Sequence, residues 1–102
     1  MSKFIAERKL NYAIKGGSER KVVIIRIGQP YLVEDSTVNF AVDKDTAGCV
    51  VAIDGLTEEI LETYYGADLV QALQLAADIE PLIKRLSKKY DFFFPSGEPY
   101  FE

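Results

Sequence analysis

The stretch Thr63–Tyr90, TYYGADLVQALQLAADIEPLIKRLSKKY, decides the fold because it holds the one long helical pattern in the chain. Its apolar residues recur at steps of three, four or seven, which lines one face of a helix and predicts that this face is buried. Asp68 stands where a helix N-cap is expected. The apolar residues are Leu69, Ala72, Leu73, Ala76, Ile79, Ile83, Leu86 and Tyr90. The last turns, where the helix dipole favours cations, contain Lys84, Arg85, Lys88 and Lys89.

Pro81 interrupts this pattern, because proline removes one backbone amide and clashes with the carbonyl group of Ala77. Two outcomes stay open: the helix kinks at Pro81, or a second helix begins with Pro81 in its first turn. The preceding segment Thr57–Tyr65 (TEEILETYY) combines glutamates that suit a helix with a Thr-Tyr-Tyr end that suits a strand. We interpret it as a strand, because Gly66 and Asp68 then mark a strand-to-helix turn.

The remaining chain shows strand patterns separated by turns. Alternation from Phe4 to Ile14 places Phe4, Ala6, Leu10, Tyr12 and Ile14 on one predicted face. Strands are predicted over Phe4–Ile14, Lys21–Ile27, Val38–Asp43, Cys49–Ile53, Thr57–Tyr65 and Asp91–Phe94, and a connecting loop over Tyr31–Thr37. We therefore expect one α+β domain over residues 1–102: an antiparallel meander of about five strands, one long C-terminal helix packed on one face, and a short last strand.

Length and composition predict a small cytosolic protein. A chain of 102 residues fits a single domain. Its longest purely apolar runs are four or five residues, too short to span a membrane. The N-terminus mixes basic residues with Glu7 and lacks the apolar core of a secretory signal. The single cysteine, Cys49, has no partner in the chain for a disulfide, which fits a reducing compartment.

Charge is segregated along the chain, whose net charge is −4. Residues 1–26 carry seven Lys or Arg against Glu7 and Glu19, whereas residues 34–80 carry eleven acids against Lys44 alone. An acidic field of this size repels nucleic acid and attracts basic proteins. Two interpretations stay open: a solvated face spread around the fold, or a docking surface for a cationic partner.

The residue inventory argues against catalysis, a metal centre and a cofactor. The chain has no histidine, which removes the commonest general base and metal ligand and excludes Ser-His-Asp and Cys-His arrangements. One cysteine without histidine also excludes a structural zinc site in a single chain. Neither a phosphate-binding loop nor a G-x-G-x-x-G motif is present. We therefore predict a protein that is not an enzyme and holds no cofactor.

Two local patterns imitate chemical sites. Asp43–Asp54 partly copies a calcium-binding loop, but Ala47 replaces one ligand and strands flank the segment, so a hairpin turn is predicted. Cys49 lies in an apolar strand and is predicted to be a buried, inert thiol.

The aromatic residues are predicted to pack in the core. The chain contains six Tyr and six Phe, but base stacking also requires basic residues between the aromatics, and Tyr64-Tyr65 is surrounded by acids. The C-terminal Tyr100 and Phe101 are a candidate exposed patch for protein binding.

Several short blocks resemble a family of small bacterial proteins known only as a domain of unknown function. The blocks are Glu7-Arg8-Lys9-Leu10, Ile27-Gly28-Gln29-Pro30, Ile53-Asp54-Gly55-Leu56 and Tyr65-Gly66-Ala67-Asp68 followed by Gln71-Ala72-Leu73. Members often have a Cys-Pro-Tyr run before the Gly-Leu, of which this chain keeps only Cys49. The resemblance implies a shared α+β fold and supplies no activity. Gln71 is predicted to bond to a neighbouring strand.

Size, charge segregation and the missing catalytic groups together favour a non-enzymatic protein-binding protein. The most concrete version is an immunity protein that neutralises a basic toxin, such as a nuclease, through an acidic surface. The alternative is a small-molecule-binding or regulatory module, with a homodimer formed through its sheet edge or its aromatic C-terminus. No nucleic acid or membrane partner is expected. The candidate partner-binding residues are Glu58, Glu59, Glu62, Asp43 and Asp45.

Overall fold

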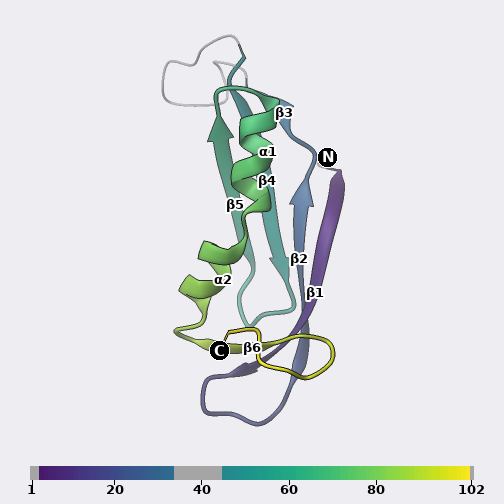
Figure 1. Ribbon diagram of the computed structural model, residues 1–102, viewed down its shortest axis with the longest axis vertical. Coiled ribbons are helices and arrows are strands. Elements are labelled where there is room, and N and C mark those ends of the chain that lie inside the picture. Colours follow the sequence, from purple (N-terminus) through teal and green to yellow (C-terminus); the bar gives the residue numbers. More distant parts are fainter. Residues whose placement is uncertain (1–2, 34–44, 102) are drawn as a thin grey trace.

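The structure, a computed structural model, describes residues 3–33 and 45–101 and has the predicted α+β class. Six strands form one antiparallel sheet, and a bent helix packs on one face of it (Figure 1). The elements in chain order are β1 (Phe4–Ile14), β2 (Lys21–Gly28), β3 (Tyr31–Leu32), β4 (Ala47–Asp54), β5 (Ile60–Gly66), α1 (Leu69–Ala77), α2 (Glu80–Leu86) and β6 (Tyr90–Phe93).

The sheet follows the predicted meander over most of its width. β1 pairs with β2, β2 with β4, and β4 with β5, all antiparallel. β3 pairs with the first residues of β4, and β6 returns from the helix to pair with the other side of β1. β5 and β6 therefore lie at opposite ends of the sheet.

Two helical segments, α1 and α2, form the bent helix. Asp68 caps α1 as predicted, because its side chain accepts a hydrogen bond from the Gln71 backbone amide. Pro81 lies in the first turn of α2, just after the bend between the two segments, so the helical stretch bends near this proline. The helix starts only at Leu69: residues 63–66, at the front of the helical stretch, belong to β5.

The strand interpretation of Thr57–Tyr65 is thus confirmed over Ile60–Tyr65. Thr63 and Tyr64 pair with Val50 and Cys49 of β4, and this cross-strand pairing suits β-branched and aromatic side chains. Gly66 ends the strand where α1 comes close, since a Cβ at this position would lie 2.5 Å from the backbone nitrogen of Ala72. The absence of a side chain lets the strand and the helix meet at this point.

The core lies between the helices and the sheet. α1 lies across β4 and β5 in Figure 1. Alternate residues of β4 are fully buried, and the aromatic residues Tyr12, Tyr90 and Phe92 join them. The prediction that the aromatics pack in the core is confirmed for these three, whereas Phe4, Tyr31, Tyr65 and Phe94 are exposed. The buried cluster comprises Leu10, Tyr12, Val23, Ile25, Ala47, Cys49, Val51, Ile53, Ala72, Ala76, Ile79, Leu82, Ile83, Leu86, Tyr90 and Phe92.

The structure corrects the predicted buried face of β1. Leu10 and Tyr12 are buried, but Phe4, Ala6 and Ile14 are exposed. An irregularity in the pairing with β2 between Phe4 and Ala6 breaks the alternation, so Phe4 no longer shares the face of Leu10. The helices cover β4 and β5 and leave the N-terminal half of β1 uncovered (Figure 1).

The predicted loop Tyr31–Thr37 is wrong at its first two residues. Tyr31 and Leu32 form β3, paired with Gly48 and Ala47. Gly48 permits this pairing, because a Cβ there would lie 2.7 Å from the Tyr31 hydroxyl oxygen.

The predicted strand Val38–Asp43 lies outside the described residues. Within the described part of the chain, no helix has the length and apolar character that a membrane crossing requires.

Candidate functional site

The charge segregation seen in the sequence persists in the folded chain. Residues 45–80, which form β4, β5, α1 and their connections, contain acids but no Lys or Arg. These elements pack on one another (Figure 1), and we call the part of the molecule that residues 45–80 form the acidic half. Its acids are Asp45, Asp54, Glu58, Glu59, Glu62, Asp68, Asp78 and Glu80.

The acidic half includes an open sheet edge. β5 pairs with β4 on one side, and no described strand pairs with its other side. Leu61 lies opposite Ala52 and, like Tyr65, points away from the helices, since Glu62 and Tyr64 pair with the core residues Val51 and Cys49. The Leu61 side chain is 71% exposed, which is unusual for a leucine in a strand.

Two of the three predicted glutamates are paired with cations of the chain itself. Lys89 Nζ lies 3.4 Å from Glu58 Oε1, and Arg85 Nη2 donates to Glu62 Oε1. Glu62 Oε2 also accepts a hydrogen bond of 2.8 Å from the Tyr64 hydroxyl. Glu59 is exposed and forms no ion pair with any described residue. The three glutamates therefore gather near the start of β5, but only Glu59 carries an unpaired charge.

The remaining two candidate residues do not join this cluster. Asp43 lies outside the described residues. Asp45 is exposed and precedes Ala47, which pairs with Gly66 at the end of β5, whereas Ile53 pairs with Ile60 at its start. Six residues of strand span about 20 Å. Asp45 is thus separated from the glutamates by the length of β5.

Two titratable groups near β5, Tyr64 and Cys49, have raised pKa values. Burial and the hydrogen bond to Glu62 raise the pKa of Tyr64 to about 12, so Tyr64 stays neutral and acts as a donor. Burial raises the pKa of the Cys49 thiol, whose Sγ donates to the Gly28 carbonyl oxygen at 3.1 Å. Cys49 is buried as predicted. Among residues 3–33 and 45–101, no group of three or more acids or cysteines is placed to hold a metal ion.

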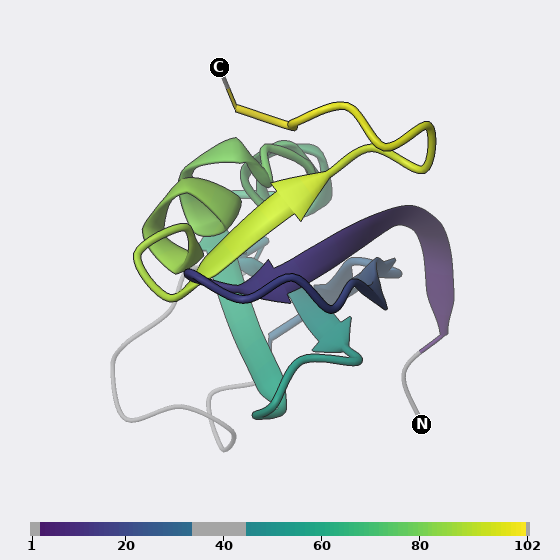
Figure 2. The same ribbon diagram turned by 90° about the horizontal axis from the view of Figure 1, so that it is seen from below.

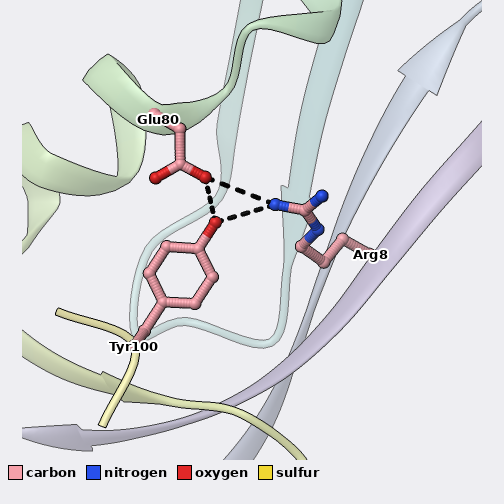
Figure 3. A network of polar contacts seen from close by, with 3 residues as sticks. All are labelled: Arg8, Glu80 and Tyr100. Atoms are coloured by element: carbon pink, nitrogen blue, oxygen red, sulfur yellow. Dashed lines mark hydrogen bonds and ion pairs between the residues drawn. The ribbon is translucent and has the colours of Figure 1, made fainter.

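Sequence reasoning missed a polar network that joins three distant segments (Figure 3). Arg8 Nη1 of β1 donates to the Tyr100 hydroxyl at 2.7 Å and lies 3.4 Å from Glu80 Oε1 of α2. The Tyr100 hydroxyl itself donates to Glu80. Burial and the bond to Glu80 raise the pKa of Tyr100. A neutral tyrosine held in this way fastens the C-terminal tail to the domain.

The predicted exposed patch at Tyr100 and Phe101 is therefore wrong. Both side chains are partly buried and pack against the core cluster, and their rings meet edge to face with centroids 5.0 Å apart. The tail also pairs with the edge of β6, where the Tyr100 amide donates to the Phe92 carbonyl oxygen at 2.9 Å. No local sequence pattern signals this docking, because its partners are up to 92 residues apart.

Comparison of the chain with protein-family models, curated proteins and solved structures finds no match. The resemblance to the bacterial family of unknown function therefore stays a prediction. Two residues of its most specific block have structural roles in this fold. Gly66 has no side chain and so lets α1 pack closely against β5, and Asp68 caps the helix.

Proposed function

We propose that this chain is a non-enzymatic protein-binding protein that docks a basic partner protein on its acidic half through β5. The observation that carries the proposal is Leu61, an apolar residue that is 71% exposed on an open edge strand, close in sequence to Glu58, Glu59 and Glu62. The most concrete version is an immunity protein that neutralises a basic toxin, such as a nuclease.

The open backbone edge of β5, its apolar side chains and the nearby acids contribute to binding in different ways. The open edge offers backbone donors and acceptors to an added strand. Leu61 and Tyr65 lie on the same outward face and provide apolar contacts that exclude water from the interface. The acids around them attract a basic partner over long range and speed its association. Affinity then comes from the strand edge and Leu61, and selectivity for basic proteins comes from the acids.

The internal ion pairs leave the glutamates accessible to a partner. Glu58 and Lys89 are both exposed, as is Arg85, and such surface pairs contribute only about 0–1 kcal/mol to stability. An arginine of the partner therefore competes with Lys89 and Arg85 at little cost. Among the three glutamates, Glu59 has no ion pair with a described residue, so its charge is available to attract a basic partner.

The test is capture of a partner by immobilised wild-type protein, Glu59→Lys and Glu19→Lys from a lysate of the source organism. Glu19 is an exposed acid in the connection between β1 and β2, outside the acidic half, so Glu19→Lys is the matched control. Near physiological ionic strength, salt screens interactions between exposed charges that lie more than about 8–10 Å apart, and higher salt shortens this distance, so each capture is repeated at low and high salt.

We expect one basic protein in stoichiometric amount, retained by the wild type and Glu19→Lys, weakened by high salt and strongly reduced by Glu59→Lys. Capture of an acidic or neutral protein, or equal loss in both variants, would contradict docking on the acidic half. Capture of nothing at either salt would contradict the protein-binding function in that organism under the growth conditions used.

A further inference from the structure

A pocket of about 580 Å³ lies beside β6, between α2 and the C-terminal tail. The consecutive segments that form the end of α2, β6 and the tail meet the turn after β1 there, which is distant from them in sequence (Figures 1 and 2). Small-molecule sites in proteins typically have volumes of about 300–1,000 Å³. The pocket is therefore large enough for a ligand with one or two rings.

Among the charged residues that line the pocket, one cation has no ion pair with a described residue, and Arg20, which lies over the Phe93 ring, is a second cation nearby. Lys15, Lys84 and Asp91 are the charged residues that line it. Lys15 Nζ lies 3.4 Å from Asp91 Oδ1, so these two charges largely cancel. Lys84 forms no ion pair with any residue that the structure describes. The pocket thus carries a net positive charge centred on Lys84, which selects an anionic group.

Aromatic rings and a proline form part of the remaining wall, together with Ser87. Phe93, Phe101 and Pro99 line the pocket together with the charged residues. The guanidinium carbon of Arg20 lies 3.7 Å from the centroid of the Phe93 ring, which holds that ring in place. Aromatic walls of this kind stack favourably on a planar ring of a ligand.

The tail wall is held in place by the Arg8–Glu80–Tyr100 network. Tyr100 lies between Pro99 and Phe101 in the chain, and its hydroxyl and backbone amide are both bonded to the domain. The Phe94 amide adds a bond of 2.8 Å to the Glu98 carbonyl oxygen. Fixing Tyr100 fixes its two neighbours, so the pocket is formed before a ligand arrives, which lowers the entropic cost of binding.

We infer that this pocket binds a small aromatic carboxylate, with the ring against the aromatic residues that line the pocket and the carboxylate on Lys84. Both parts of the ligand are required by the lining: the aromatic walls do not select an inorganic anion, and the free lysine does not select a neutral ring. The site is separate from the proposed docking strand β5, so it does not depend on the protein-binding function.

The test uses three probes in NMR titrations of the full chain: 2-naphthoate, its neutral analogue 2-naphthamide, and inorganic phosphate. We expect saturable amide shifts with 2-naphthoate, centred on Lys15, Lys84, Phe93 and Phe101. The affinity for 2-naphthamide should be at least about fivefold lower, as expected from the loss of one charge-assisted contact. Phosphate should give no saturable shift at these residues.

Two lysine variants locate the carboxylate. Lys84→Gln should weaken 2-naphthoate binding by about fivefold to tenfold, because it removes the free cation. Lys88→Gln, a neighbouring exposed lysine that does not line the pocket, should leave the affinity unchanged. Tyr100→Phe should weaken binding of both naphthoate and naphthamide, because it loosens the tail wall rather than removing charge.

Three results would overturn the inference. The first is the absence of saturable shifts with 2-naphthoate. The second is equal affinity for the acid and the amide. The third is an equal effect of Lys84→Gln and Lys88→Gln, which would place the anion outside this pocket.

Discussion

Asp68 and Gln71 cap the entry of α1 reciprocally. The Asp68 carboxylate accepts a hydrogen bond of 2.8 Å from the Gln71 backbone amide, and the Gln71 side-chain oxygen accepts one of 2.5 Å from the backbone amide of Ala67. Two backbone donors without partners inside the helix are thus satisfied by two side chains, as in a capping box. The predicted side-chain bond of Gln71 exists, but it closes the entry turn of its own helix and does not reach a strand.

This cap predicts the cost of removing either side chain. Asp68→Ala should lower the free energy of unfolding by about 1 kcal/mol, the usual loss for an N-cap residue. Gln71→Ala should cost less, since it removes only one neutral hydrogen bond, about 0.5 kcal/mol. Gln74→Ala, an exposed change in the same helix, should stay within about 0.5 kcal/mol of the wild type. Urea denaturation measures all three, and an Asp68→Ala loss no larger than that of Gln74→Ala contradicts the cap.

We predict that a side chain added at Gly66, at the junction of β5 and α1, lowers the free energy of unfolding by more than the loss of the cap does. A Cβ at this position would lie 2.5 Å from the backbone nitrogen of Ala72, and backbone does not yield as a side chain does. Gly66→Ala should therefore cost at least about 2 kcal/mol, within the range of overpacking substitutions. Gly16→Ala is the control: its φ is +83° but the space is open, so about 1 kcal/mol of backbone strain is expected. If Gly16→Ala lowers the denaturation midpoint more than Gly66→Ala does, the close approach of α1 to Gly66 does not determine the cost of the substitution.

We predict that the raised pKa of Tyr64 makes the folded protein less stable at high pH. Its pKa is raised to about 12 by burial and by the bond to Glu62, whereas its usual value is 10.0. Above pH 10 the unfolded chain releases this proton more readily than the folded chain, so stability falls as pH rises from about 10 towards 12. Tyr64→Phe should make this fall shallower. Urea denaturation between pH 8 and about pH 11 measures the slope, and an unchanged slope would contradict the assignment.

We predict that the Cys49 thiol of the native protein reacts slowly with a thiol reagent. The side chain is fully buried, its Sγ donates to the Gly28 carbonyl oxygen, and burial raises its pKa, so the reactive thiolate is scarce and inaccessible. Labelling by a disulfide reagent should be at least about a thousandfold slower in the native protein than in urea, because it requires global opening. Rapid labelling of the native chain would show that β4 opens locally.

Local patterns predicted the elements whose cause is local. The N-cap at Asp68, the proline in the first turn of α2 and the buried Cys49 all follow from a few neighbouring residues. The strand β3 has only two residues, too few to show a period of two, so it was assigned to a loop. The pairing of β1 with β2 is irregular between Phe4 and Ala6, which changes the side of the sheet on which Phe4 lies. The amino-acid composition of the strand does not indicate this irregularity.

Long-range pairing explains what the sequence did not predict at the candidate site. Arg85 is 23 residues from Glu62 and Lys89 is 31 residues from Glu58, so their ion pairs depend on how α2 returns towards β5. In the sequence, only the spacing of Arg85 and Lys89, four residues apart, hints that they act together, although α2 ends at Leu86 and Lys89 lies in the turn that follows. The exposure of Leu61 likewise depends on which strand ends the sheet, which hydrophobicity alone does not determine.

Site-specific photo-crosslinking tests the central claim, docking through β5, most directly. A photoreactive amino acid replaces Leu61 in one variant and Val22 in another. Val22 is an exposed apolar residue of β2 and is 46% exposed, so it is a matched control outside the acidic half.

Irradiation is carried out in a lysate of the source organism at low salt, and the adducts are identified by mass spectrometry. The account predicts a crosslink to one basic protein from position 61 that is absent from position 22 and lost at high salt. Crosslinks of equal yield from both positions, or adducts from position 61 only to a second copy of this chain, would contradict it.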